Sequence, residues 1–206
     1  TMSSKIAGYL YPEANIQNIG FERTNYPDGY FDVAIGNLPF GDYRVNDSVY
    51  NSHGFLIHDY FFAKTLDKLR AGGVAAYITT KGTMDKESTK VREFLFKKAE
   101  LLGAIRLPNT AFNNAGTKVT ADILFLQKRE KEIENPEWIA VTEDAQGFRI
   151  NSYFVQHPEM ILGTMQEISG PYGMETTCVE KEGVPLGERL RAAISHITGH
   201  IPERVE

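Results

Sequence analysis

Short apolar runs alternate with amphipathic segments between residues 30 and 107, and this alternation limits the folds that the chain can adopt. The apolar runs span residues 30–36, 74–79 and 104–107, and each is short enough to be a buried strand. Between these runs, apolar residues recur at helical spacing over residues 55–70, and a Ser88 cap and a following Gly103 predict a second helix over residues 88–102. Strands that alternate with helices form a mostly parallel sheet with flanking helices, so the sequence predicts an α/β fold.

The segments on either side of this core have less regular patterns. We expect a helix over residues 3–10, a strand over residues 14–21 and a further strand over residues 121–127. Beyond residue 135 we expect strands at 138–141 and 174–179 and helices at 152–162, interrupted near Pro158, and 186–197. The sequence therefore divides into a core, residues 1–132, and a small α+β C-terminal extension of unknown role, residues 133–206.

Composition and charge exclude several classes of protein. No apolar run approaches the roughly 18 residues of a membrane span, and the N-terminus lacks the layout of a signal peptide, so we expect a cytoplasmic protein without membrane contact. Cys178 has no second cysteine to pair with, and the five histidines lack the spacing of a zinc site, so we expect no metal. With a net charge of −5, the chain lacks the excess of basic residues that a free-standing nucleic-acid binder usually carries.

The tetrapeptide Asn37-Leu38-Pro39-Phe40 follows the first apolar run, at the carboxyl end of a predicted strand. Open α/β sheets bind their ligands at that end of the strands. The Asn37 side-chain carbonyl and the adjacent backbone carbonyl can accept both hydrogens of an exocyclic amine, while the proline stiffens the loop. Phe40 offers a flat face on which a base can stack. An Asn-x-Pro turn can also simply end a strand, and such a pattern arises by chance in about one chain in eight of this length.

The stretch DVAIGNLPFG resembles the catalytic motif of amino-group methyltransferases, especially the adenine-N6 DNA methyltransferases. Residues 105–112 and 117–126 are similar to the late part of the modification subunits of type I restriction systems. A further resemblance, over roughly residues 3–129, is to the methylase region of very large helicase-methylase polypeptides carried on mobile elements. The resemblance implies a partial Rossmann-like fold, the fold of methyltransferases that use S-adenosylmethionine.

The resemblance also implies a role for individual residues. Asn37 and the Leu38 carbonyl would accept hydrogen bonds from the adenine N6 amine, and Phe40 and Phe112 would stack on the flipped base. The methyl group would pass directly from S-adenosylmethionine to the amine, with no covalent enzyme intermediate. Related enzymes contact the cofactor adenine at the positions of Phe21 and Glu22. Lys81 follows the second apolar run, where it could contact DNA or remain solvated.

One part of the family pattern is missing from this sequence. No Gly-x-Gly turn, which would let the backbone approach the cofactor, follows any predicted strand. We therefore expect a fragment of a longer protein with an incomplete S-adenosylmethionine site. Such a fragment should bind S-adenosylmethionine poorly or not at all, and its own activity stays open. The motif strand would lie at an exposed sheet edge, where the chain could associate with itself. DNA would be held by the parent protein, through helicase or target-recognition sequence, or by a partner.

Two other functions stay open on this evidence. One is an amino-group methyltransferase that acts on a protein glutamine or on RNA, because those families hold a planar amide or amine in the same way. The other is a non-catalytic scaffold or DNA-organising module with a degenerate methyltransferase fold. The intact residues Asn37, Pro39 and Phe40 favour a catalytic parent, whereas the missing glycine turn favours the scaffold.

Overall fold

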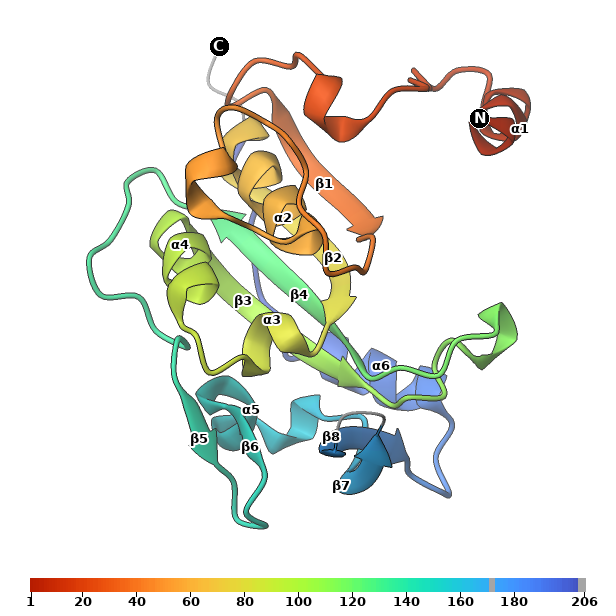
Figure 1. Cartoon of the computed structure of the whole chain (residues 1–206), viewed down its shortest axis with the longest axis vertical. Helices are drawn as coiled ribbons and strands as arrows, with labels where there is room; N and C mark the ends of the chain where they lie inside the picture. Colours follow the sequence, from red (N-terminus) through yellow and green to blue (C-terminus); the bar gives the residue numbers. More distant parts are fainter. Residues whose placement is uncertain (171–172, 204–206) are drawn as a thin grey trace.

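A four-stranded sheet forms the centre of the protein, which we describe from a computed structural model covering residues 1–170 and 173–203 (Figure 1). Its strands, in the spatial order β1-β2-β4-β3, are β1 (Phe31–Asn37), β2 (Leu69–Thr80), β4 (Ala121–Lys128) and β3 (Ala99–Leu107). Strand β1 pairs with β2 in parallel, while β4 runs antiparallel between β2 and β3. Three of the four strands thus share one direction, which confirms the predicted α/β fold with a mostly parallel sheet.

Two helices cover one face of this sheet, α2 (Ile57–Lys68) and α4 (Lys90–Lys98). Their apolar residues at helical spacing, among them Phe62, Leu66 and Leu95, are fully buried against the strands, as the periodicity predicts. A short helix, α3 (Gly82–Asp85), follows β2 and was not predicted.

Strand β2 begins five residues earlier than the sequence indicates, at Leu69, directly after α2. The glycines at 72 and 73, which follow the helix expected over residues 55–70, lie inside the strand. A Cβ atom on Gly73 would lie 3.0 Å from the carbonyl oxygens of Arg70 and Asp32, which is tighter than an ordinary contact, so glycine favours this close approach of β1 and β2.

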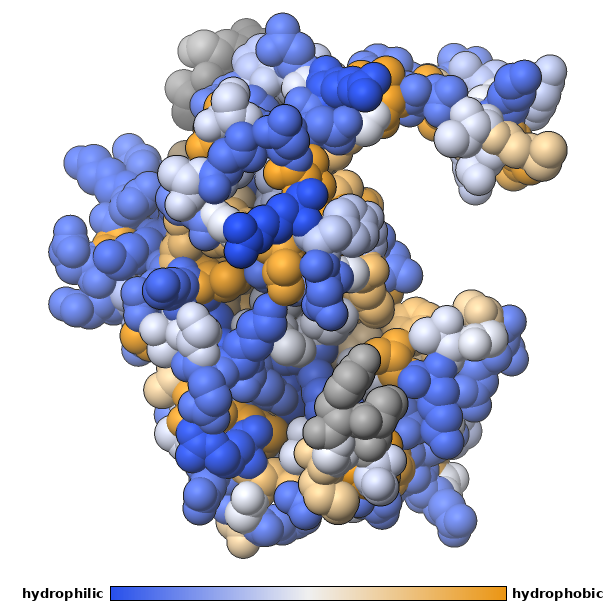
Figure 2. All heavy atoms as spheres, viewed as in Figure 1, coloured by the Kyte–Doolittle hydropathy of each residue, from blue (hydrophilic) through white to orange (hydrophobic). Residues whose placement is uncertain are grey.

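The N-terminal region departs most from the sequence-based expectations. Helix α1 (Met2–Leu10) is confirmed, but it buries none of its residues and extends away from the rest of the molecule (Figure 1, Figure 2). The predicted strand over residues 14–21 is wrong: residues 11–20 are exposed, and a single 3₁₀ turn, η1 (Phe21–Arg23), follows them. A strand needs a neighbour for its backbone hydrogen bonds, and this segment pairs with none of the described strands.

The C-terminal part forms two hairpins and short helices at the end of the sheet. Its elements are β5 (Val141–Glu143), β6 (Arg149–Asn151), α5 (Ser152–Gln156), η4 (Pro158–Met160), β7 (Gly163–Gly170), β8 (Gly173–Glu180) and α6 (Leu186–Ile194). The strand expected at 138–141 is wrong, because Trp138 has φ 61° and the strand starts only at Val141. The helix expected at 152–162 is interrupted before Pro158, as predicted, whereas β6 and β7 were not predicted.

Buried residues from both sequence regions share one hydrophobic core. Phe154, Met160 and Cys178 pack in the same cluster as Leu124 and Ile105 of the sheet. The division at residue 132 stays a prediction. No helix within the described residues is long and apolar enough to cross a membrane.

Candidate functional site

The Asn37-Leu38-Pro39-Phe40 motif lies where β1 ends, as predicted. Asn37 is in register with Ile78 of β2, and the Leu38 N–H donates to the Ile78 carbonyl at 3.0 Å. Leu38 is 5% exposed, so its buried side chain anchors the motif. The Asn37 side chain and the Phe40 ring are exposed. The motif therefore sits at the carboxyl edge of the parallel strand pair, where α/β proteins bind ligands.

Two hydrogen-bond acceptors of the motif are free. Within the described part of the chain, neither the Asn37 carboxamide nor the Leu38 carbonyl takes part in a hydrogen bond. Adjacent acceptors of this kind match the two N–H donors of an exocyclic amine. The motif can thus accept such a group without breaking any bond of the folded chain.

The loop after the motif is fixed to the first turn of α2. The Ile57 N–H donates to the Tyr43 carbonyl at 2.9 Å. Beside it, His58 and Asp59 are both buried, with His58 Nε2 3.4 Å from Asp59 Oδ1. No hydrogen bond reaches either ring nitrogen of His58 from the described residues. Burial lowers the pKa of His58 and raises that of Asp59.

Phe112, the second predicted stacking residue, lies in the loop that joins β3 to β4. We call residues 108–120 the Phe112 loop; its centre contains a 3₁₀ turn, η3 (Asn113–Ala115), and is exposed. The Phe112 ring is half-buried against the core. No ring contact joins Phe112 to Phe40, and neither ring stacks on another aromatic side chain in the described residues. Both rings are therefore free of stacking partners, but the structure does not show them as one site.

Phe21 and Glu22 lie beside α2 rather than at the motif. The Phe21 ring centroid is 4.9 Å from that of Phe61 and 6.1 Å from that of Tyr60. Lys64 Nζ lies 5.2 Å from the Phe21 ring centroid, at a distance typical of a cation–π contact. The structure thus gives Phe21 a packing role, and its proposed contact with a cofactor stays a prediction.

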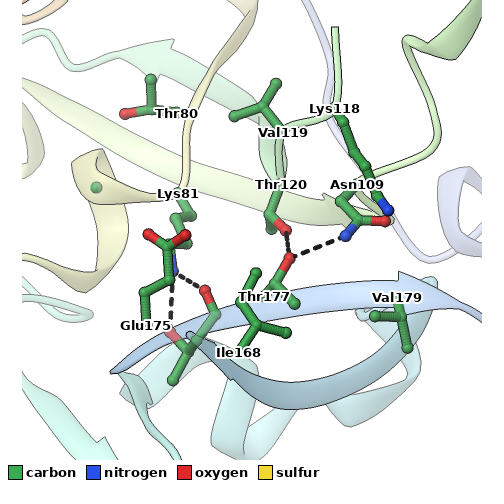
Figure 3. A pocket seen from close by; sticks show the side chains of 12 residues that line it. Thr80, Lys81, Asn109, Lys118, Val119, Thr120, Ile168, Glu175, Thr177 and Val179 are labelled. Atoms are coloured by element: carbon green, nitrogen blue, oxygen red, sulfur yellow. Dashed lines mark hydrogen bonds between the residues drawn. The ribbon is translucent and has the colours of Figure 1, made fainter. Parts of the chain in front are cut away.

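Lys81, predicted as a DNA contact, is half-buried and points toward β8 (Figure 3). Its ammonium donates to the Thr176 carbonyl and, at 2.9 Å, to Thr176 Oγ1. Burial and the nearby Arg106 lower the pKa of Lys81. Two of its three donors are therefore used within the protein.

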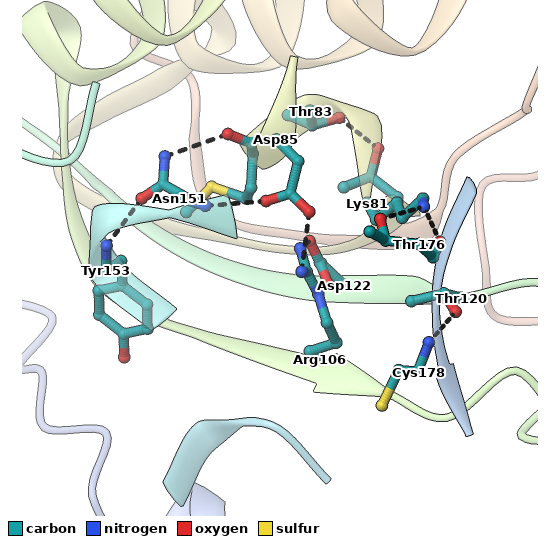
Figure 4. Close-up of polar contacts among 12 residues, drawn as sticks. Lys81, Thr83, Asp85, Arg106, Thr120, Asp122, Asn151, Tyr153, Thr176 and Cys178 are labelled. Atoms are coloured by element: carbon teal, nitrogen blue, oxygen red, sulfur yellow. Dashed lines mark hydrogen bonds and ion pairs between the residues drawn. The ribbon is translucent and has the colours of Figure 1, made fainter. Parts of the chain in front are cut away.

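A buried ion cluster lies below Lys81, and the sequence analysis did not single it out (Figure 4). Arg106 is fully buried and donates from Nε and Nη2 to the two carboxylate oxygens of Asp122, both at 2.9 Å. Its Nη1 lies 2.8 Å from Asp85 Oδ2. Burial alone would lower the pKa of Arg106, but these carboxylates raise it overall. An arginine and an aspartate inside apolar strands were the signal that could have revealed the cluster.

Strand β8 lies at the carboxyl edge of the sheet, where it is hydrogen-bonded to the Phe112 loop. The Asn109 N–H donates to the Cys178 carbonyl at 2.7 Å, and the Cys178 N–H donates to Thr120 Oγ1 at 2.9 Å. Thr177 Oγ1 lies within hydrogen-bond distance of Asn109 Nδ2, at 3.2 Å, and of Thr120 Oγ1, at 3.0 Å. Strand β8 thus pins both ends of the Phe112 loop.

An open pocket of about 460 Å³ remains between β8, the Phe112 loop and the end of β2 (Figure 3). We call it the hairpin pocket. No cluster of three or more histidine, cysteine or acidic side chains that could hold a metal occurs in residues 1–170 and 173–203.

Comparison with known proteins identifies a family for the chain. Residues 13–166, or 154 of the 206 residues, match the family described as N-6 DNA Methylase. The protein named defense against restriction protein B, from Escherichia phage P1, is 32% identical over 139 residues, which is 65% of this chain and 6% of that protein. The chain therefore spans a small part of the length of this relative.

Two solved structures resemble parts of the chain. The M protein of the type I restriction enzyme EcoKI is 21% identical, with a TM-score of 0.44 over 56% of this chain and 25% of that one. A modification subunit of a type I restriction enzyme from Vibrio vulnificus YJ016 is 17% identical, with a TM-score of 0.43 over 60% of this chain and 37% of that one. Because the family match covers three quarters of its residues, the chain belongs to the N-6 DNA methylase family.

Proposed function

We propose that the chain is part of a methyltransferase that methylates the N6 amine of adenine in DNA. The observation that carries this proposal is the pair of free acceptors, Asn37 and the Leu38 carbonyl, at the carboxyl edge of β1 in a member of the N-6 DNA methylase family. They match the two hydrogens of the amine, and Phe40 beside them has an exposed ring.

The geometry suggests what each residue does in the reaction. An adenine must leave the duplex to reach the motif, which costs a few kcal/mol of stacking and pairing. Stacking of the base on Phe40 and Phe112 offsets part of this cost. Asn37 and Leu38 then accept hydrogen bonds from both amine hydrogens, which withdraws the nitrogen lone pair from conjugation with the ring and leaves it free to attack a methyl donor. The bond from the nitrogen to the methyl group forms as the donor's bond to that methyl group breaks, and one amine proton passes to water.

S-adenosylmethionine is the methyl donor that we propose, as the resemblance of the sequence implies. The described residues do not complete a site for it. Phe21 packs on α2, and Glu22 forms an ion pair with its neighbour Arg23 at 3.4 Å. No hydrogen bond, ion pair or ring contact joins either residue to the motif within the described part of the chain. We therefore derive no step through the cofactor from this chain and propose that further sequence of the parent protein completes its site.

DNA reaches the motif, in our proposal, with the help of other parts of the parent protein or a partner in the cytoplasm. The chain carries a net charge of −5, and its half-buried Lys81 is already bonded to β8. Strand β1 lies at the edge of the sheet and exposes Val33 and Ile35 at 51% and 82%. This edge is where we expect another strand, from the parent or from a second copy of the chain, to pair.

Methyl transfer by the parent protein tests the proposal. We expect labelled S-adenosylmethionine to methylate adenine in DNA, and Asn37→Ala to reduce the rate at least 100-fold, while Asn114→Ala in the exposed Phe112 loop leaves it unchanged. Because Asn37 makes no side-chain hydrogen bond in the described structure, the variant should fold normally. Methylated glutamine or RNA instead of DNA would assign the chain to the alternative substrates, and an Asn37→Ala protein with full activity would contradict the role of the motif.

A further inference from the structure

The hairpin pocket lies beside the motif but is separate from it. Its wall includes Thr80, Lys81 and Gly82, which follow Ile78, the register partner of Asn37. Its other walls come from β8 and from both ends of the Phe112 loop (Figure 3). None of Asn37, Phe40 and Phe112 lines it. A ligand in this pocket would therefore lie next to a base held at the motif without occupying the same place.

Strand β8 fixes the polar groups of the pocket in advance. Asn109 is only 6% exposed, and its Nδ2 donates to Thr177 Oγ1. This bond leaves Asn109 Oδ1 without a partner among the described residues, as an oriented acceptor in the pocket wall. Lys81 is held in the same way by Thr176, which leaves one N–H donor free. Preorganised donors and acceptors of this kind favour ligand binding because little side-chain entropy is lost.

Two charged side chains stand at the rim. Lys118 is exposed and has no ion-pair partner in the part of the chain that the structure describes, and Figure 3 shows its ammonium beside Asn109. Glu175 is also exposed, and its carboxylate lies beside Lys81 in the same view. The pocket thus offers a cation on the Asn109 side and a further acceptor on the Lys81 side.

The remaining wall is apolar, with Val119, Ile168 and Val179 contributing aliphatic side chains. A mostly apolar wall with a few fixed polar groups suits a flat heterocycle with polar edges. On the Lys81 side, the Glu175 carboxylate can accept from an exocyclic amine, and the free N–H of Lys81 can donate to a ring nitrogen or carbonyl beside that amine. Asn109 Oδ1 offers a second acceptor on the opposite side of the pocket. Lys118 is placed to bind a phosphate.

We propose that the hairpin pocket binds a second nucleotide of the substrate DNA strand, one whose base carries an exocyclic amine, next to the adenine at the motif. This inference rests on the proposed function, which supplies the nucleic-acid strand. It assigns β8, which lies beyond the 13–166 family match, to substrate binding. Thymine lacks the amine and is expected to bind less well.

The chain itself can be tested by NMR titration with six-nucleotide single strands of deoxycytidine, deoxyadenosine or thymidine. We expect amide shifts at residues 80–82, 118–120 and 176–177, with dissociation constants at least threefold lower for the amine-bearing strands. Lys118→Ala should weaken binding three- to tenfold and lower the salt slope of log Kd by about 0.7, the value for one phosphate contact on a single strand. Lys131→Ala, at an exposed position outside the pocket, is the matched control.

A second variant tests the effect of the negative charge at the rim of the pocket. Glu175→Gln removes a negative charge at the rim but keeps an acceptor oxygen, so it should tighten binding of all three strands two- to threefold. Shifts confined to residues 37–40 and 112 would overturn the second subsite while supporting the proposed function. Equal binding of the thymidine strand, or equal effects of Lys118→Ala and Lys131→Ala, would also overturn it. An absence of all shifts would overturn the subsite, and the methyl-transfer experiment would still decide the proposed function separately.

Discussion

The two ends of the sheet's carboxyl edge differ sharply in whether their polar groups have hydrogen-bond or ion-pair partners within the protein. At the β1 end, Asn37 and the Leu38 carbonyl have no partner in the described residues, and Ile35 is 82% exposed. At the other end, where β8 is hydrogen-bonded to the Phe112 loop (the β8 end), Arg106 and Asp122 are fully buried. The Arg106 guanidinium there donates to both carboxylate oxygens of Asp122. Burial raises the pKa of the Cys178 thiol there to about 12, which makes it unreactive at neutral pH.

This difference separates binding from stability within one edge. Groups that are free in the folded chain can bind an amine without first breaking an internal bond, and their loss removes little stability. A buried ion cluster has the opposite character, because removing one partner leaves a buried charge uncompensated. The β8 end therefore contributes stability, and the β1 end presents free hydrogen-bond acceptors.

The largest effect is expected at the β8 end. Arg106→Met leaves the carboxylates of Asp122 and Asp85 without their cation, so we expect a loss of about 3–5 kcal/mol in the free energy of unfolding. Urea denaturation followed by circular dichroism measures this change.

Arg149 provides a matched control, because it also binds a carboxylate through two nitrogens. Its Nε and Nη2 donate to Glu87 at 2.9 and 3.0 Å, but this pair is exposed. Arg149→Met should change the free energy of unfolding by no more than about 1 kcal/mol. Equal losses for the two variants would show that burial of the Arg106 cluster does not matter.

A smaller effect depends on pH and concerns His58, beside the motif loop. Burial lowers its pKa, so the folded protein resists the proton that the unfolded chain accepts. The free energy of unfolding should therefore have its full value above the ordinary histidine pKa of about 6.5. It should fall as the pH drops below that value, by up to about 1.4 kcal/mol per pH unit. Asp59 and Asp42 oppose this shift, and Lys86 reinforces it.

His58→Leu should flatten the stability profile between pH 7 and 5, measured as urea midpoints at each pH. His196→Gln, at an exposed position, should leave the slope as in the unmodified protein. A slope that His58→Leu does not change would assign the acid sensitivity to other groups.

The sequence predicts those parts of the fold whose signals are local. The apolar runs of β1, β2 and β4 and the helical spacing of α2 lie within single elements, so their types could be predicted without knowing their neighbours. The strand expected at 14–21 failed because a strand also needs a partner, which local pattern does not reveal. Strand β7, with the sequence GTMQEISG, carries few apolar residues and gave no signal.

The candidate site follows the same rule. Asn37 to Phe40 are contiguous, so the motif could be recognised at once. The contact of Lys81 with Thr176 joins residues 95 positions apart, and that of Asn109 with Thr177 joins residues 68 apart. Such pairings depend on where β8 folds back, which the sequence of either partner alone does not specify.

The smallest effect is expected at the β1 end. Asn37→Ala removes a side chain that is exposed and makes no hydrogen bond in the described structure, so the free energy of unfolding should change by no more than about 0.5 kcal/mol. Ile35→Thr, at another exposed position of the same strand, should have a similarly small effect. Both values come from the urea titration used for Arg106→Met.

The small stability change expected for Asn37→Ala supports the difference between the two ends only if it is confined to the β1 end. A loss above about 1.5 kcal/mol for Asn37→Ala would mean that the motif helps to hold the fold, and loss of methyl transfer in that variant could then reflect unfolding. A loss within the expected limit, together with loss of methyl transfer in the parent protein, would place the effect of Asn37 in binding or catalysis. The stability measurement on this chain therefore determines how the activity measurement on the parent can be read.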